Sequence, residues 1–297
     1  MIMKRTTNVL LRLLCCITAA SIVTGCLKED VDDCPQVYLL TVKAYNESGT
    51  ELGMSTVSDV SLFIFDNATR FVRQINTQLN ESVTVEAPAG EDIHIVGWGN
   101  LAGGGQTYVQ PAVGDLLANC FVELQTTSRA ASYVLSPGEL FRGQIAIAAS
   151  ERSGDKELPI YLEVGSMSIT IRNLKTFAGY NDNNYSVIIQ ETYSDIGFDG
   201  HTAGDKVAYI PAGSFVTNGG KEEYSVPTFN MVSEEAGVRI EIYHGTTLIA
   251  TISQDNAGRP IKVEKGKLTN VVIDLQRSLD VNVSINDWGN SGGQKEF

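Results

Sequence analysis

The chain has 297 residues, and its 35 Asp and Glu side chains outnumber its 22 Lys and Arg side chains, which gives a net charge of −13 at pH 7. Binding to nucleic acid phosphates needs a basic face, yet no cluster of Lys or Arg follows Arg12. Composition and charge therefore argue against nucleic acid as a partner and against binding to anionic lipid headgroups.

The first 25 residues have the layout of a secretory signal peptide. Three basic residues precede an uncharged stretch over residues 13–25, which is well short of the about twenty apolar residues that a membrane-spanning helix needs. The stretch ends in Val23-Thr24-Gly25-Cys26, which resembles the lipobox at which bacterial lipoproteins are cleaved and acylated. We expect residues 1–25 to be removed and Cys26 to carry acyl chains such as palmitate. The alternative is an ordinary signal peptide that is cleaved nearby.

Residues 26–36 follow as an acidic tether. The run Leu27-Lys28-Glu29-Asp30-Val31-Asp32-Asp33 is too polar to bury an apolar core. It resembles the acidic surface-export signals of Bacteroidales lipoproteins, although a plain solvated spacer has the same composition. Loss of residues 1–25, which hold three positive charges and no negative ones, would change the net charge from −13 to −16. We expect a protein that is lipid-anchored in the outer membrane and faces the cell surface.

Five cysteines are present, two of them in the signal segment and one at the lipobox. The remaining two, Cys34 and Cys120, could form a disulfide in the oxidising envelope. The alternative is a pair of buried thiols.

Alternation of apolar and polar residues predicts β-strands almost throughout the rest of the chain. The alternating runs are Tyr38 to Ala44, Val60 to Ile64, Val83 to Val85, Ile93 to Ile95, Met167 to Ile171, Val238 to Ile242 and Leu279 to Ile285. Turn clusters rich in Gly and Asn separate them at spacings typical of antiparallel sandwiches. Only residues 112–120 indicate a short helix, with Leu116 and Leu117 on its buried side. The fold class is therefore all-β.

A charged run that contains Gly and Ser, residues 150–156, interrupts the strand pattern near the middle of the chain. We place a domain boundary there, which gives an N-terminal β-sandwich over residues 37–155 and a C-terminal β-sandwich over residues 156–297. A weak internal repeat supports two similar halves, because Trp98-Gly99-Asn100 recurs as Trp288-Gly289-Asn290, in each case after a predicted strand.

The sequence carries no recognisable catalytic constellation. Its three histidines lack the partner spacing of a metal site or triad, and neither a nucleophile elbow nor a phosphate-binding glycine loop is present. The densest oxygen-ligand region, around Asp195, Asp199 and Asp205, matches no calcium motif. Nothing singles out the paired carboxylates that a glycosidase needs. We expect a non-enzymatic protein without metal or cofactor.

Several local patterns follow one another in a recognisable order. They are the lipobox at Cys26, Asp33-Cys34-Pro35 before the first strand, Leu62-Phe63-Ile64-Phe65-Asp66 followed by Phe71, Gly97-Trp98-Gly99-Asn100, Phe141-Arg142-Gly143, and a late strand followed by Trp288. In this order and spacing the chain resembles the fimbrial anchor subunits of the FimB type, which are lipoproteins at the base of Bacteroidales (type V) fimbriae.

The resemblance implies two transthyretin-like antiparallel β-sandwiches in series. It also implies a subunit that tethers a fimbria to the outer membrane through its N-terminal lipid and limits the length of the fibre. Its partners would be fimbrillin stalk subunits, joined by strand addition, in which an extended segment of one subunit fills a groove in the next.

A subunit held by its N-terminal lipid cannot lose its first strand by proteolysis without losing its anchor. We therefore expect its own groove to stay filled and the protein to act only as a strand donor. The candidate donor strand carries Leu279, Val281, Val283 and Ile285; the tail over residues 286–297 is the other candidate. The alternative for the first segment is that it is the last core strand of the C-terminal sandwich.

Two other functions stay open at this level. A fimbrial tip or accessory subunit would begin after an internal arginine, such as Arg70, Arg73 or Arg129. An outer-surface glycan-binding lipoprotein would use Trp98, Trp288 or some of the eleven tyrosines as a binding platform.

Overall fold

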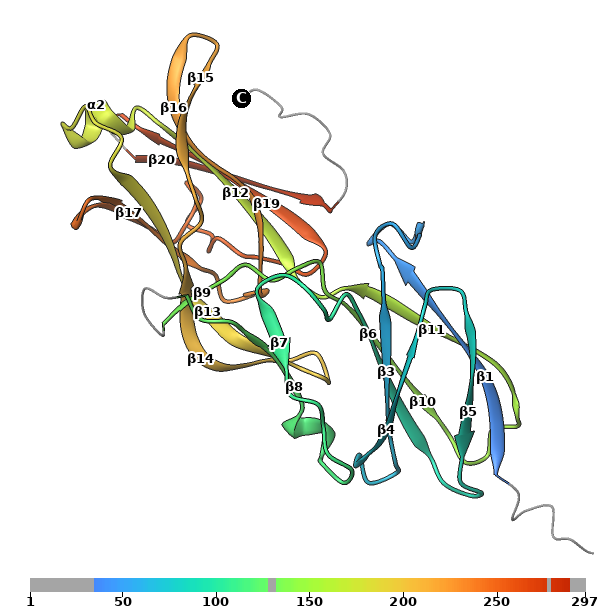
Figure 1. Ribbon diagram of the computed structural model, residues 1–297. Helices are drawn as coiled ribbons and strands as arrows, with labels where there is room; N and C mark the ends of the chain where they lie inside the picture. Colours follow the sequence, from blue (N-terminus) through green and yellow to red (C-terminus); the bar gives the residue numbers. More distant parts are fainter. Residues whose placement is uncertain (1–34, 128–131, 277–278, 289–297) are drawn as a thin grey trace, which may run out of the picture.

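The computed structural model describes residues 35–127, 132–276 and 279–288, and the regular secondary structure of these residues is almost entirely β-strand (Figure 1). They form three sheets of eight, five and seven strands. Two helical segments accompany them, the 3-10 helix η2 (Leu117–Asn119) and the α-helix α2 (Leu174–Ala178). The prediction of an all-β fold built from antiparallel sheets is confirmed.

The first sheet has the order β2-β1-β11-β10-β6-β3-β4, and β5 lies beside β1. Its strands are β1 (Gln36–Tyr45), β2 (Glu51–Leu52), β3 (Val60–Phe65), β4 (Phe71–Thr77), β5 (Ser82–Ala87), β6 (Ile93–Gly99), β10 (Phe141–Ile147) and β11 (Gly154–Leu162). Only two residue pairs join β10 to β11, so the sheet turns there and folds back on itself. Gly97 of β6 accordingly faces the side chain of Leu158 of β11, which leaves no room for a Cβ atom.

The second sheet has the order β15-β16-β12-β19-β20. Its strands are β12 (Gly165–Arg172), β15 (Ser214–Asn218), β16 (Lys221–Met231), β19 (Lys267–Leu275) and β20 (Leu279–Asp287). Pairing of β12 with β19 is parallel, and β20 closes the sheet as an antiparallel edge strand.

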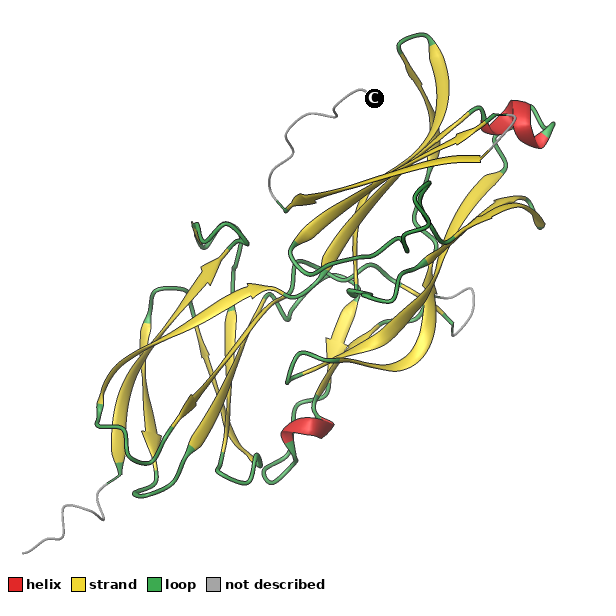
Figure 2. Ribbon diagram, turned by 180° about the vertical axis from the view of Figure 1, so that it is seen from behind, coloured by secondary structure: helices red, strands yellow, loops and turns green. Residues whose placement is uncertain are grey.

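The third sheet has the order β18-β17-β13-β14-β9, with β8 beside β13 and β7 beside β8. Its strands are β7 (Gln106–Tyr108), β8 (Phe121–Leu124), β9 (Tyr133–Val134), β13 (Tyr185–Gly197), β14 (Thr202–Tyr209), β17 (Arg239–His244) and β18 (Thr247–Ile252). Seen from behind, the second and third sheets lie one above the other at the end of the molecule far from β1 (Figure 2).

The predicted domain boundary between residues 155 and 156 falls inside β11, which belongs to the first sheet. The charged Gly/Ser run that suggested it is the exposed turn between β10 and β11, and such turns have the composition of linkers. Sheet membership changes instead between Leu162 and Gly165. In addition, β7, β8 and β9 belong to the third sheet, although they come from the N-terminal half of the sequence. The division into two domains therefore stays a prediction.

The helix expected over residues 112–120 is wrong except for the single turn of η2. Leu116, expected on a buried side, is exposed. The segment runs back along β4, where the Leu117 N–H donates to the Thr69 carbonyl (2.8 Å) and the Phe71 N–H donates to the Asp115 carbonyl (2.7 Å). Backbone pairing with a distant strand has thus taken the place of local helical hydrogen bonds.

Candidate functional site

Strand β1 lies in the interior of the first sheet and is paired along both edges. Eight residues, Tyr38 to Tyr45, pair in parallel with β11. On the other edge β1 pairs with β5 over its first part and with β2 at its end. Its alternate side chains, Tyr38, Leu40, Val42 and Ala44, are at most 1% exposed. This strand is therefore a core element, and the groove between β5 and β11 is filled by the chain itself.

Side-chain bonds fix both ends of β1 to β11 and to the turn before it. At the start, the Tyr38 hydroxyl donates to the Glu151 carbonyl and the Val37 N–H donates to Ser153 Oγ, both at 3.0 Å. At the end, Lys43 lies between two carboxylates, of which Glu157 has the larger effect in raising the pKa of the lysine. These contacts hold the register of the strand.

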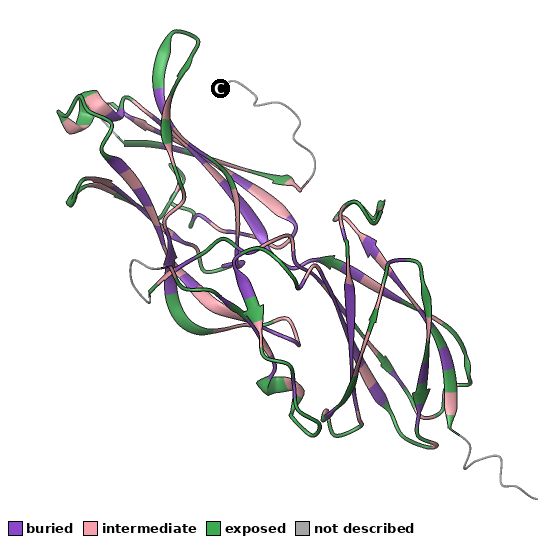
Figure 3. Ribbon diagram, viewed as in Figure 1, coloured by how far each residue is buried: buried purple, intermediate pink, exposed green. Residues whose placement is uncertain are grey.

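Strand β20, the predicted donor strand, lies at the edge of the second sheet. All nine of its residues pair with β19. The register places Leu279, Val281, Val283 and Ile285 opposite residues of β19 whose side chains face the core. Only Val281 is buried, at 3% exposure, whereas Leu279 and Ile285 are 46% and 42% exposed. Figure 3 shows the contrast with the neighbouring strands, which are buried along much of their length.

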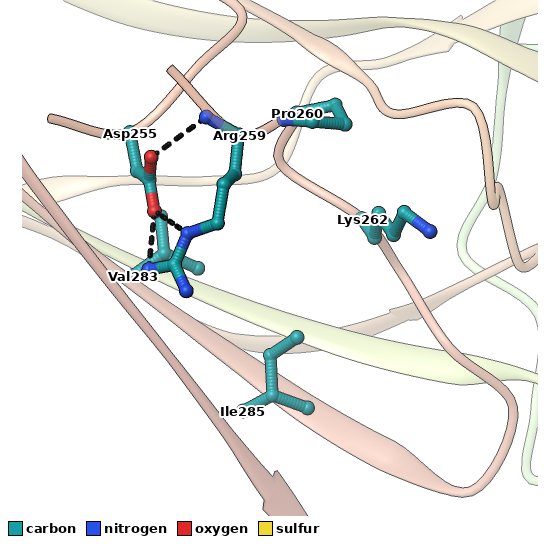
Figure 4. A pocket seen from close by; sticks show the side chains of 6 residues that line it. All are labelled: Asp255, Arg259, Pro260, Lys262, Val283 and Ile285. Carbon is teal, nitrogen blue, oxygen red and sulfur yellow. Dashed lines mark hydrogen bonds and ion pairs between the residues drawn. The ribbon is translucent and has the colours of Figure 1, made fainter. Parts of the chain in front are cut away.

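A hollow of about 440 Å³ lies beneath β20 and accounts for the exposure of Ile285 (Figure 4). Its lining residues are Asp255, Arg259, Pro260, Lys262, Val283 and Ile285. Here the loop between β18 and β19 covers the strand instead of a second sheet. That loop is braced by an Asp255–Arg259 ion pair (2.7 Å), and hydrogen bonding to the arginine lowers the pKa of the aspartate. Both Val283 and Ile285 line the hollow, but Val283 also packs partly against the core.

Few contacts besides the ladder with β19 hold β20. Asn256 accepts from the Val281 N–H (2.8 Å) and donates its own N–H to the Val281 carbonyl (3.1 Å). At the end of the strand Asp287 forms an ion pair with Lys267, and the Trp288 ring meets the Phe141 ring edge-on with centroids 6.4 Å apart.

Several residues of the family motifs gather where the first sheet meets the third. Phe198, which follows β13, packs between Phe63 (ring centroids 4.7 Å apart) and Trp98 (5.7 Å). Trp98 is completely buried there. The sequence offered it as part of a repeat or of a glycan platform, whereas its buried ring has a packing role.

A buried charge cluster, the junction cluster, joins the same parts of the molecule. The Glu163 carboxylate, which is buried, accepts from Arg142 Nε (3.2 Å) and from the Lys265 ammonium. Arg142 also donates to the Phe198 carbonyl (3.1 Å), and Lys265 to the Gly200 carbonyl (2.7 Å). Each charge has a partner, so the first sheet and the loops of the second and third sheets are joined by directional bonds as well as by apolar packing.

Sequence reasoning singled out Arg142 within a motif but missed Glu163, Phe198 and Lys265. The latter three come from separate loops or strand ends, where no periodicity marks a residue. A carboxylate next to an apolar strand, as in Leu162-Glu163-Val164, was the one available signal.

The remaining predicted site residues are only partly described. Cys26 and Cys34 lie outside the described residues, so lipidation and the disulfide stay predictions. Cys120 is buried, and its thiol donates to the Leu116 carbonyl (3.4 Å). Burial raises the pKa of this thiol to about 11.

The described part of the chain has no group of three or more His, Cys, Asp and Glu side chains placed to hold a metal ion. His244 pairs with Asp182 instead (2.7 Å) and stacks on Tyr180. In the same residues no helix is long and apolar enough to cross a membrane.

The architecture defines a class of protein: stacked, mainly antiparallel sheets with a filled N-terminal groove and a loosely held strand near the other end. The chain belongs to the family of fimbrillin-A associated anchor proteins Mfa1 and Mfa2, whose sequence profile matches residues 31–291. The resemblance to fimbrial anchor subunits is thereby confirmed.

Individual relatives agree with this assignment. The major fimbrium anchoring subunit FimB of Porphyromonas gingivalis is 26% identical over 287 residues, which cover 89% of this chain and 90% of FimB. The fold is similar to that of the fimbrial anchor protein Mfa2 from P. gingivalis, with a TM-score of 0.60, 14% identity, and coverage of 86% of this chain and 98% of Mfa2. A candidate adhesin of Bacteroides thetaiotaomicron has a TM-score of 0.59 at 16% identity, over 87% of this chain and 98% of the adhesin. The names of these relatives describe fimbrial or adhesive proteins.

Proposed function

We propose that this protein is the lipid-anchored base of a cell-surface fimbria, which it tethers to the outer membrane and whose growth it ends. Family membership and the anchoring role in the name of FimB support this proposal. The lipid would be attached at Cys26. Each buried CH₂ group contributes about 0.8 kcal/mol to membrane binding, so several acyl chains on one residue make a durable anchor.

The observation that carries the proposal is the filled groove of the first sheet. Cys26 lies ten positions before Gln36, where β1 begins. A lipid on that residue is therefore linked through a short tether to a strand in the core. Because β1 pairs along both edges, the groove it fills has no place for a strand from another subunit. A subunit that cannot accept a strand stops a chain built by strand addition, which gives the length limit a physical cause.

Strand β20 supports the other half of the proposal, the donation of a strand to the first stalk subunit. Its alternating apolar side chains are the kind of set that successive pockets of a groove receive. Its departure would remove only the buried Val281 and the partly buried Val283 from the core, and Ile285 is already exposed beside the hollow. The tail over residues 286–297 remains the second candidate for the donated segment.

The experiment that tests the anchor role is the mass and N-terminal analysis of the protein purified from outer membranes, with Cys26→Ala in parallel. We expect an acylated Cys26 at the N-terminus and, in the variant, fimbriae shed into the medium. A native protein that begins after an internal arginine would instead support a tip or accessory subunit. Acylation without any effect of the variant on fimbriae would contradict the anchor role.

A further inference from the structure

The strand directions place the start of β1 and the start of β4 at the same end of the first sheet. β1 runs parallel to β11, and the antiparallel pairings through β10, β6 and β3 reverse the direction at each step, so β4 runs the same way as β1. We call this end the tether end, because the chain enters it from Cys26. The ten positions from Cys26 to Gln36 can span at most about 36 Å, so this end would stay close to a membrane that holds the lipid.

A loop of the third sheet reaches the tether end. It connects β7 to β8, and its middle part runs along the start of β4. There the Gly114 N–H donates to the Phe71 carbonyl (2.8 Å), and the Phe71 N–H donates to the Asp115 carbonyl. Both views of the molecule show this loop beside the turn from β3 to β4 (Figures 1 and 2).

Apolar side chains on this loop and on β4 are exposed to solvent. We call them the apolar patch: Val72 (44% exposed), Val109 (71%), Val113 (81%) and Leu116 (43%). Val72 follows Phe71 and Val113 precedes Gly114, so the hydrogen bonds between Phe71 and Gly114 bring the two valines near each other. Single exposed apolar residues are ordinary on a protein surface, whereas a group of them marks an interaction site.

A braced turn holds Val113 out in the solvent. The Asp115 N–H donates to the Ala112 carbonyl (2.9 Å), and the Ala112 N–H donates to the Asp115 carboxylate (2.7 Å). Gly114 has a φ of 95°, which glycine adopts far more readily than other residues. The exposure of Val113 therefore follows from the conformation of the turn.

Two arginines border the apolar patch. Arg70 lies opposite Leu116 in an isolated bridge, Arg73 follows Val72, and both arginines are exposed. Apolar side chains next to guanidinium groups suit the boundary between the acyl chains and the phosphate headgroups of a membrane. Two arginines are too few to hold an acidic protein on a membrane by themselves, so this contact would need the acyl chains on Cys26 as a second signal.

We propose that the apolar patch contacts the headgroup layer of the outer membrane, as a second attachment beside the lipid on Cys26. This inference rests on the lipid anchor of the proposed function and adds an orientation to it. The tether raises the effective concentration of the patch at the membrane, so a contact that is weak alone becomes populated. Two attachments would fix the angle of the molecule and keep the second sheet, with β20, turned away from the membrane (Figure 1).

The test uses the full acylated protein in vesicles of phosphatidylethanolamine, phosphatidylglycerol and brominated phosphatidylcholine, whose bromines quench tryptophan. The probe is Val113→Trp. Its added emission should fall by about half or more in brominated vesicles, because such contacts enter the boundary between headgroups and acyl chains. The matched control is Val216→Trp, at an exposed position (43%) of β15 on the second sheet, which should not be quenched. Flotation of the vesicles reports in the same samples whether the protein is anchored.

Two results would overturn the inference while the anchor stands. They are unquenched emission from Val113→Trp in protein that floats with the vesicles, and equal quenching of Val113→Trp and Val216→Trp, which would show a molecule without a fixed orientation. Protein that does not float would contradict the lipid anchor itself, and the membrane contact that rests on it would fall too. Flotation therefore distinguishes the two failures.

Discussion

Strands β1 and β20 share an alternating pattern of apolar residues in the sequence. In the structure, however, β1 lies in the interior of its sheet and β20 lies at the edge of its sheet. β1 has neighbours on both edges and four alternate side chains that are at most 1% exposed. β20 has one neighbouring strand and a single buried side chain, Val281. Full burial of a large apolar side chain contributes about 1.5–3 kcal/mol. The difference teaches that location within the sheet, and not apolar pattern, decides how deeply the apolar side chains of a strand are buried.

The largest expected effect comes from the core face of β1. Leu40→Ser should lower the free energy of unfolding by about 5 kcal/mol, because it leaves a cavity and buries a hydroxyl group. Chemical denaturation measures this against Leu39→Ser, which lies on the exposed face of the same strand and should change stability by less than about 1 kcal/mol. Equal effects of the two substitutions would contradict the description of β1 as a core strand.

The next effect concerns the junction cluster, which joins the first sheet to the loops of the second and third sheets. Glu163→Gln should destabilise the protein by about 3 kcal/mol, because Arg142 and Lys265 lose a buried negative partner. Glu235→Gln removes an exposed ion pair with Lys262 and should cost less than about 1 kcal/mol. A junction that tolerates the first change as well as the second would be held by apolar packing alone.

The comparison is tested directly on the apolar face of β20. Val283→Asn combined with Ile285→Asn should lower the free energy of unfolding by about 1–2 kcal/mol, much less than Leu40→Ser, since Ile285 is exposed beside the hollow and Val283 is only partly buried against the core. The same pair should greatly reduce the fimbriae retained on cells, if β20 is the donated strand. Ser284→Asn combined with Asn286→Ser alters the opposite face of β20 and serves as the control. Normal retention in the first variant would leave the tail as the donor.

The smallest effect concerns a second attachment at the start of β1. A disulfide between Cys34 and Cys120 would tie the residues before β1 to the start of β8, in addition to the hydrogen bonds described. Without it, the thiol of Cys120, whose pKa is raised to about 11, stays protonated at pH 8 in the folded protein. Since the thiolate is the reactive form, iodoacetamide should label Cys120 only after unfolding, or as the pH approaches 11. Lack of labelling even in the unfolded, unreduced protein would reveal the disulfide.

Local pattern in the sequence was enough to predict the strands but not their neighbours. Alternation from Tyr38 to Ala44 and from Leu279 to Ile285 predicted both strands and the face that each turns inward. It could not predict that residues 106–124 cross to β13, because that pairing depends on a partner about 70 positions later in the chain. The predicted domain boundary lies inside β11 for a related reason, since a charged turn and a linker have the same composition.

The candidate site was predictable to a similar extent. The candidate donor strand and the first strand were singled out by their pattern and by the resemblance, whereas the edge position of β20 and the hollow beneath it could not be predicted. The junction cluster could not be predicted because Glu163 and Lys265 are brought together only by the tertiary fold.

The parallel pairing of β1 with β11 has a mechanical consequence. A pull on the residues before Gln36 draws β1 toward its own N-terminal end, while a pull transmitted by the second sheet draws β11 toward Leu162, its C-terminal end. Because the two strands run in the same direction, these opposed forces slide them past each other and do not peel them apart. The eight residue pairs from Tyr38 to Tyr45 then carry the load together, so the ladder has to fail all at once and not one bond at a time.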